Sequence, residues 1–226
     1  MFERPIDYPC AIADQTDEGM VAAFDWLLDH KKEGEEITLW VPMRSTLRNN
    51  HFLIDLSQYE GRGFRIVAKN EVRRANGPVL AVHPNVENLA YVTVAMGISA
   101  LAVVQWNDKF ETWAKEVNAE VLYKLDLEED LLNYGEGPEP ELVAEVVEGL
   151  KSITNMVNHN NTIAGGREKD ITVGTLLQLH DQGFSLPPKR MAEWAIAHGW
   201  QRDNPKELIK WVKKINSGSR PRISRY

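Results

Sequence analysis

The stretch that decides the fold is residues 78–104, which read PVLAVHPNVENLAYVTVAMGISALAVV. Pro78–His83 and Ala100–Val104 are apolar segments of strand length. Between them, Asn85–Met96 has a helical pattern, with Asn85 at the N-cap position and Gly97 just past the end. Two apolar strands joined by a helix predict a β–α–β unit, because parallel pairing requires a crossover and the helix supplies it.

The same alternation continues on both sides of this unit. Further apolar segments lie at Ile37–Val41, Phe64–Ala68 and Val121–Tyr123, and helical patterns lie at Asp17–Lys32, Ser45–Gln58 and Asp108–Asn118. Strands that are apolar on both faces predict a sheet covered on both sides. We therefore predict that residues 1–158 form an α/β domain with a mainly parallel, doubly wound sheet. Because the link between Phe64–Ala68 and Pro78–His83 is too short for a helix of ordinary length, we expect one of these strands to be antiparallel or at the edge.

The C-terminal part of the sequence predicts a small three-helix region. A helix from about Glu139, with an apolar stripe through Val146, Leu150 and Ile153, is expected to pack on the sheet. Residues 159–170 are polar and Gly-rich, which predicts a linker. Residues 171–226 follow as a basic helical domain, with helices predicted at Thr172–Gln182, Pro187–His198 and Pro205–Ile215, with Asn204 as the cap of the third, and with Trp194, Trp200 and Trp211 in the core.

Composition excludes several classes of protein. The 226 residues are 43% hydrophobic and 26% charged, as in ordinary globular proteins. No apolar run approaches the roughly 18 residues of a membrane span and no signal-peptide pattern begins the chain, so we expect a cytoplasmic protein without a membrane partner. The single cysteine, Cys10, excludes an intrachain disulfide and a cysteine-based zinc cluster.

The charge is distributed unevenly along the chain. Residues 1–150 contain 13 Lys and Arg against 27 Asp and Glu, a net charge of −14, whereas residues 151–226 contain 13 against 6, a net charge of +7. Such a change of sign indicates that the C-terminal region meets an anionic partner, which is either nucleic acid or another acidic surface.

Catalytic and cofactor motifs are absent from the sequence. It has no phosphate-binding G-x-x-x-x-G-K-[ST] loop, no G-x-G-x-x-G after a strand, no G-x-S-x-G and no H-E-x-x-H. The six histidines show no H-x-H or H-x₃-H spacing. We therefore predict no metal and no cofactor, and the sequence assigns no residue a catalytic role.

Polar residues that follow the predicted strands are candidates for a ligand site. In open α/β sheets ligands bind beyond the carboxyl ends of the strands, and a mixture of cations, amides and a carboxylate at these ends suits a small anionic ligand. His83 would be a possible acid or base near neutral pH, although strand ends are polar in any protein. The candidates are Arg44, Ser45, Lys69, Asn70, His83, Asn85, Asn107 and Asp108.

The basic C-terminal region is the second candidate site. A helix, a Gly-containing turn and further helices, the last of them basic, resemble in outline the helix-turn-helix family of nucleic-acid binders, which implies a nucleic-acid partner. Phosphate neutralisation needs a row of cations, and a solvated basic helix end gives the same pattern. The candidate residues are Lys206, Lys210, Lys213, Lys214, Arg220, Arg222 and Arg225.

Three functions remain open from the sequence. The leading one is an α/β protein whose helical module contacts nucleic acid or another acidic surface. The second is an enzyme that acts on a small anionic ligand at the strand ends. The third is a non-catalytic interaction scaffold whose basic region docks on its own acidic domain or on another copy of the chain.

Overall fold

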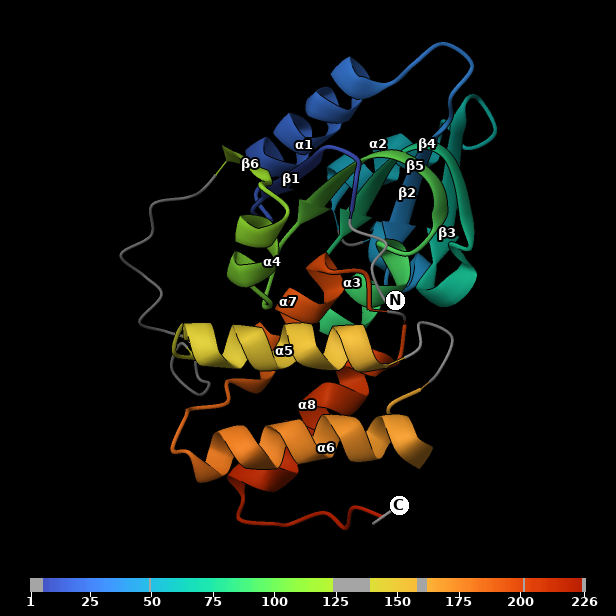
Figure 1. The fold of residues 1–226 in the computed structure, drawn as a ribbon. Helices are drawn as coiled ribbons and strands as arrows, with labels where there is room; N and C mark the ends of the chain where they lie inside the picture. Colours follow the sequence, from blue (N-terminus) through green and yellow to red (C-terminus); the bar gives the residue numbers. More distant parts are fainter. Residues whose placement is uncertain (1–5, 49, 124–138, 158–161, 201, 225–226) are drawn as a thin grey trace. The chain divides into compact units, whose positions relative to one another are not determined.

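The computed structural model describes residues 6–48, 50–123, 139–157, 162–200 and 202–224. Contacts between residues divide the chain into two compact units, with a boundary between Leu127 and Glu128. We call the first part, Ile6–Leu127, the sheet unit and the part from Glu128 onward the helical unit, and each is described by itself. The predicted fold class is confirmed: the chain has a parallel α/β sheet and a C-terminal helical region (Figure 1).

The described strands form one six-stranded sheet in the order β3-β2-β4-β5-β1-β6, and each pair is parallel. The strands are β1 (Cys10–Ala13), β2 (Ile37–Val41), β3 (Phe64–Ala68), β4 (Arg74–Val82), β5 (Met96–Val104) and β6 (Glu120–Tyr123). We expected either β3 or β4 to be antiparallel or at the edge of the sheet. β3 lies at the edge and is parallel, so the edge alternative is confirmed. β1 was not predicted from the sequence.

Helices cover the sheet on both sides. α1 (Asp17–His30) and α2 (His51–Ser57) pack on one face, where Met20 and Leu27 of α1 meet Leu39 and Leu80 of the strands. α3 (Val86–Val92) and α4 (Glu111–Glu116) lie on the other side (Figure 1). This division follows from right-handed crossovers, because the chain moves in one direction along the sheet through α1 and α2 and returns through α3 and α4.

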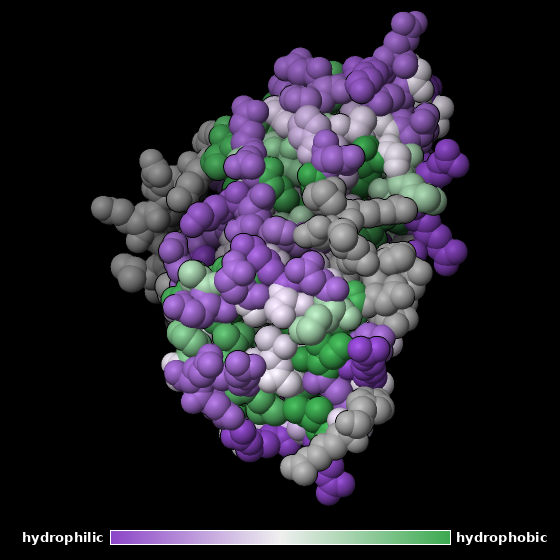
Figure 2. All heavy atoms as spheres, in the orientation of Figure 1, coloured by the Kyte–Doolittle hydropathy of each residue, from purple (hydrophilic) through white to green (hydrophobic). Residues whose placement is uncertain are grey.

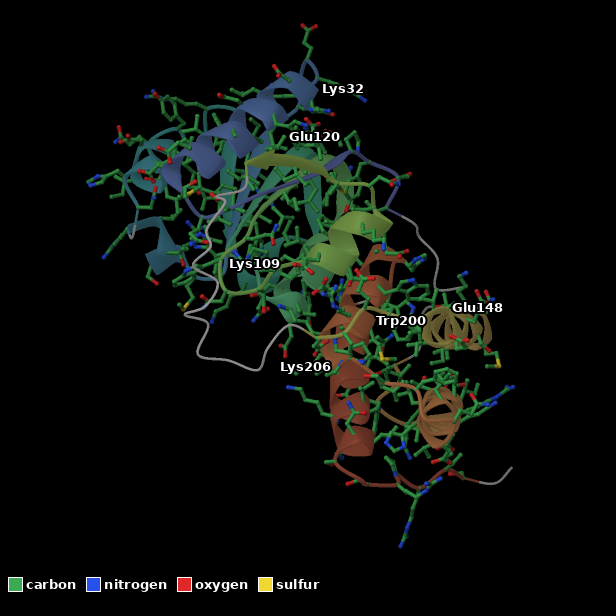
Figure 3. The ribbon with its side chains drawn as sticks, turned by 90° about the vertical axis from the view of Figure 1, so that its left-hand side faces the viewer. Lys32, Lys109, Glu120, Glu148, Trp200 and Lys206 are labelled. Carbon is green, nitrogen blue, oxygen red and sulfur yellow. The ribbon has the colours of Figure 1, made fainter. Side chains whose placement is uncertain are left out.

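Local capping explains where two of these helices begin. The Thr16 hydroxyl accepts a hydrogen bond from the Gly19 amide at 3.0 Å, and the Asn85 side chain accepts one from the Asn88 amide at 2.8 Å. The Asn85 cap was predicted and is confirmed. On β6, Glu120 (Figure 3) accepts a hydrogen bond from the Trp26 indole of α1 at 2.9 Å. This contact ties the edge strand to the helix that covers it.

The helical unit contains α5 (Ala144–Met156), α6 (Gly166–Asp181), α7 (Pro188–Ala197) and α8 (Asn204–Asn216). The expectation that the helix after Glu139 packs on the sheet was wrong, since Val146, Leu150 and Ile153 of α5 are buried with side chains of α6, α7 and α8. The stripe had predicted burial but could not say against which neighbour. Residues 166–170 of the predicted linker belong to α6.

Tryptophans fill the core of the helical unit, as predicted. Trp194, Trp200 and Trp211 are buried. The Trp200 indole (Figure 3) donates a hydrogen bond to the Thr154 hydroxyl of α5 at 2.9 Å. α5 is therefore part of the same core as the three predicted helices.

The predicted cap of the last helix was wrong in detail. The N-cap of α8 is Asp203, and Asn204 is the first helical residue. The Asn204 side chain instead accepts a hydrogen bond from the buried Ile163 amide at 3.1 Å. Asn204 thus satisfies a distant backbone donor that would otherwise be buried without a partner.

Candidate functional site

The carboxyl edge of the sheet brings the predicted ligand residues into one row. Lys69 and Asn70 follow β3, Arg44 and Ser45 follow β2, His83 and Asn85 follow β4, and Asn107 and Asp108 follow β5. These strands are consecutive in the sheet. With about 4.8 Å between neighbouring strands, the row is about 15 Å long from β3 to β5. The eight residues therefore share one edge of the sheet and are spread along it.

Two members of the row have structural partners. One guanidinium nitrogen of Arg44 donates to the Ile66 carbonyl at 3.2 Å, and another lies 3.7 Å from the Glu60 carboxylate. Asn85 caps α3 with its side chain. Arg44 is thus directed toward the edge strand and Asn85 toward its own helix, which weakens the prediction that both contact an anionic ligand.

The other row members vary in exposure. Ser45, Lys69 and Asn107 are exposed, and Asp108 is half-buried. The backbone of Lys69 has φ of 52°, and its carbonyl accepts a hydrogen bond from the Trp40 indole at 2.6 Å. Asn70 lies in the short η2 turn (Lys69–Glu71), and its side chain is outside the described part of the structure.

His83 has an unusual environment at the end of β4. Its φ of 53° lies in the left-handed region, which residues other than glycine rarely adopt. Its backbone amide donates to the Val104 carbonyl at 2.9 Å. The Nε2 atom is buried and has no hydrogen-bond partner among the described residues. Burial lowers the pKa of the imidazole, which favours its neutral form.

Sequence reasoning missed two exposed apolar residues along this edge, one of which contacts His83. Trp106 follows β5 and is 54% exposed, and its ring centroid lies 5.2 Å from that of His83. Met43 follows β2 and is 55% exposed. The signal was present in the sequence, because Trp106 lies two residues after the predicted strand Ala100–Val104.

In the helical unit, α8 separates its apolar and cationic residues. Leu208, Trp211, Val212 and Ile215 are buried. The cations are exposed, and we call them the α8 lysine face: Lys206, Lys210, Lys213 and Lys214. At 100° per residue, the four lysines span an arc of about 100° opposite the buried side. The structure therefore places the predicted lysines together.

Trp211 lies between this face and α6. The ammonium groups of Lys210 and Lys214 lie 5.2 and 4.9 Å from the centroid of the Trp211 ring, and that of Lys169 on α6 lies 5.7 Å away. These distances allow cation–π attraction. The Trp211 indole donates to the Ile163 carbonyl at 3.0 Å, which fixes the ring. Lys169 was not among the predicted residues.

The two described arginines after α8, Arg220 and Arg222, have different contacts. Arg220 makes two hydrogen bonds to Asp181 of α6, at 2.9 and 2.6 Å, and this pairing lowers the pKa of Asp181. The Arg222 carbonyl accepts a hydrogen bond from Lys169 at 2.6 Å, so its exposed guanidinium extends from an anchored backbone. Arg225 lies outside the described residues. Arg220 is therefore occupied by an acidic partner of its own chain.

The basic surface does not lie on the helix that the helix-turn-helix resemblance would use for recognition. α7 occupies the place of the second helix in that arrangement, but every residue from Met191 to Ala197 is buried. The exposed cations belong to α8. A nucleic acid would thus meet the third helix of the predicted trio.

Other chemistry is limited among the described residues. They contain no group of three His, Cys, Asp or Glu side chains arranged to bind a metal ion, and none of their helices is long and apolar enough to cross a membrane. Figure 2 shows a face on which hydrophilic side chains surround patches of apolar ones. Val143 and Met156, at the two ends of α5, are exposed apolar residues.

Comparison with known proteins gives one match, and it falls on the helical unit. Residues 144–226 match the model of a family described as a domain of unknown function, DUF1889. The match begins at the first residue of α5. It therefore covers all four helices of the helical core and none of the sheet. No curated protein and no solved structure matches the chain.

Proposed function

We propose that the helical unit binds nucleic acid non-specifically through the α8 lysine face. The observation that carries this proposal is the clustering of Lys206, Lys210, Lys213 and Lys214 on one exposed side of a helix whose opposite side is buried. A row of cations spaced along a rigid helix can follow a phosphate backbone and displace its counterions.

Local charge pairing supports an external partner. Lys210 lies 2.8 Å from Glu207, whereas Lys213 and Lys214 have no ion-pair partner among the residues that the structure describes. The Trp211 ring that contacts Lys210 and Lys214 restricts where their ammonium groups lie. Such restriction reduces the side-chain entropy that these lysines lose when they bind.

The surface favours non-specific over sequence-specific binding. Lysine offers a point charge on a flexible stem, whereas base readout uses the planar donors of arginine or the amides of asparagine and glutamine. The α8 lysine face contains none of these. We therefore expect the lysines to contact the phosphate backbone of the nucleic acid without recognising its base sequence.

The test is the salt dependence of binding by the full chain. Fluorescence anisotropy with labelled duplex DNA and labelled single strands should give an affinity that falls with salt, with a log–log slope of about −0.9 per duplex phosphate contacted. The triple variant K210A/K213A/K214A should lower affinity for all sequences alike and flatten that slope by up to about three units.

A matched control separates the lysine face from net charge. The variant K31A/K32A/K115A removes the same number of charges from the sheet unit and should retain nearly the full affinity. Equal losses in both variants would mean that net charge alone acts. Absence of wild-type binding to duplex or single strands at low salt would overturn the proposal and leave an acidic protein surface as the partner of the lysine face.

A further inference from the structure

The order of the strands marks two positions along the carboxyl edge of the sheet, between β2 and β4 and between β5 and β1, where neighbouring strands lead into helices on opposite faces. The first of them lies beside His83. β2 and β4 are neighbours, but β2 leads into α2 on one face while β4 leads into α3 on the other. Open α/β sheets bind ligands outside such a switch point. The order differs from the 3-2-1-4-5-6 order of dinucleotide-binding sheets, so the position must be judged from its own residues.

His83 follows β4 at this point and has two energetically unfavourable features. It leaves β4 in a left-handed backbone conformation, and its buried Nε2 has no hydrogen-bond partner among the described residues. Unfavourable backbone conformations and unsatisfied buried polar atoms concentrate at binding and catalytic sites, where a ligand completes the missing contact.

Trp106 provides the second half of the site. All seven tryptophans lie in the described part of the chain, and the other six are at most 9% exposed, whereas Trp106 is 54% exposed. Its ring lies 5.2 Å from the His83 ring, from the next strand in the sheet. An exposed indole beside a hydrogen-bonding imidazole offers a flat apolar surface and a polar contact at its border.

We propose that the carboxyl ends of β4 and β5 bind a small planar heteroaromatic molecule, which stacks on Trp106 and forms a hydrogen bond with Nε2 of His83. A neutral imidazole either donates or accepts at this atom, depending on its tautomer. The ligand therefore bears a ring nitrogen or an N–H group at its border. Exposed Met43 follows β2, the strand on the other side of β4.

This ligand differs from the anionic one that the sequence predicted. Arg44 is directed to Glu60 and the Ile66 carbonyl, and Lys69 lies two strands from β4. Neither cation is positioned beside His83 to neutralise a phosphate. The recognition elements that the structure brings into contact here are the aromatic plane of Trp106 and the imidazole of His83.

The experiment uses the full chain and defined probes. Saturation-transfer NMR would be recorded with adenosine, guanosine, cytidine, uridine, nicotinamide and riboflavin at millimolar concentration. At least one should bind, and its affinity should fall about tenfold or more in W106A, as expected for loss of a stacking partner. The ¹⁵N signal of His83 Nε2 should shift on addition of that probe. H83N should also weaken binding, because Asn tolerates the left-handed backbone but has no imidazole.

The control variant is Y59A. Tyr59 is 56% exposed in the same unit but precedes the amino end of β3, so its removal should leave binding unchanged. Binding should also persist in K210A/K213A/K214A, which separates this site from the proposed nucleic-acid surface. If no probe binds, if W106A binds as tightly as the wild type, or if only oligonucleotides bind, the small-molecule site is refuted.

Discussion

His83 has two features that are unfavourable for the folded state. A left-handed backbone costs a non-glycine residue about 1–2 kcal/mol, and a buried nitrogen without a partner loses its hydrogen bonds to water. Sequence reasoning selected His83 only because it follows a strand. Its backbone conformation and its lack of a partner depend on how β4 turns into α3, which no local pattern in the sequence encodes.

The low pKa of His83 predicts acid sensitivity. Because burial lowers its pKa in the folded protein, the unfolded chain takes up the proton first as the pH falls below the ordinary value of about 6.5. The free energy of unfolding should therefore decrease between pH 7.5 and pH 5.5 more in the wild type than in H83N. The measurement is urea unfolding of both proteins at both pH values.

The comparison with H83N cancels the other five histidines to first order. A wild type and a variant that lose the same stability on acidification would mean that the imidazole is as easily protonated in the fold as in the unfolded chain. That result would contradict its burial. It would leave the stacking role of Trp106 to be judged by ligand binding alone.

At the scale of elements, α7 depends on a side chain from far along the chain. The Glu139 carboxylate accepts hydrogen bonds from the backbone amides of Lys189 and Arg190, at 2.9 and 3.0 Å. These amides belong to the first turn of α7, which has no cap from its own sequence. A carboxylate at this position satisfies unpaired donors and interacts favourably with the helix dipole.

Removal of this cap should destabilise the protein measurably. E139A should lower the free energy of unfolding by about 1 kcal/mol, and E139Q by less, because its amide oxygen still accepts a hydrogen bond. E141A is the matched control, since Glu141 is exposed nearby, and should change stability little. Urea unfolding at neutral pH measures all three. A similar small effect in E139A and E141A would show that the contact contributes nothing net.

The sequence predicted those structural features whose interacting residues are close together in the chain. Asn85 could be identified as a cap because a cap bonds within its own first turn. β1 was missed because Cys10–Ala13 is short and half alanine, which is poor in strand-forming residues. The partners of Glu139 and Asn204 lie far away in the chain, so their roles required the structure.

For the candidate sites, the sequence predicted where residues lie in the fold better than it predicted which residues they contact. It placed His83 at the carboxyl edge and the α8 lysines together, because strand order and helical spacing determine both. It could not predict that Arg220 pairs with Asp181 or that Trp106 is exposed. These depend on tertiary packing, which decides whether a cation is neutralised and whether an indole is covered.

At the scale of the whole chain, α5 decides where the helical unit begins. Val146, Leu150 and Ile153 of α5 and its C-cap residue Val157 are buried in the helical core. At about 1.5–3 kcal/mol for each buried side chain of this size, they contribute about 6–12 kcal/mol as an upper estimate. A small domain has a total stability of about 5–15 kcal/mol, so the helical unit should not fold without α5.

Two fragments test this inference. Residues 139–226 should fold alone, with a helical circular dichroism spectrum and a cooperative urea transition. Residues 159–226 correspond to the linker and basic domain predicted from the sequence, and they lack both α5 and the Thr154 hydroxyl that accepts the Trp200 indole bond. They should unfold without a cooperative transition, because the face of α6 that packs on α5 would be exposed. Cooperative unfolding of both fragments with equal stability would instead place the boundary near residue 158 and make α5 dispensable to the helical core.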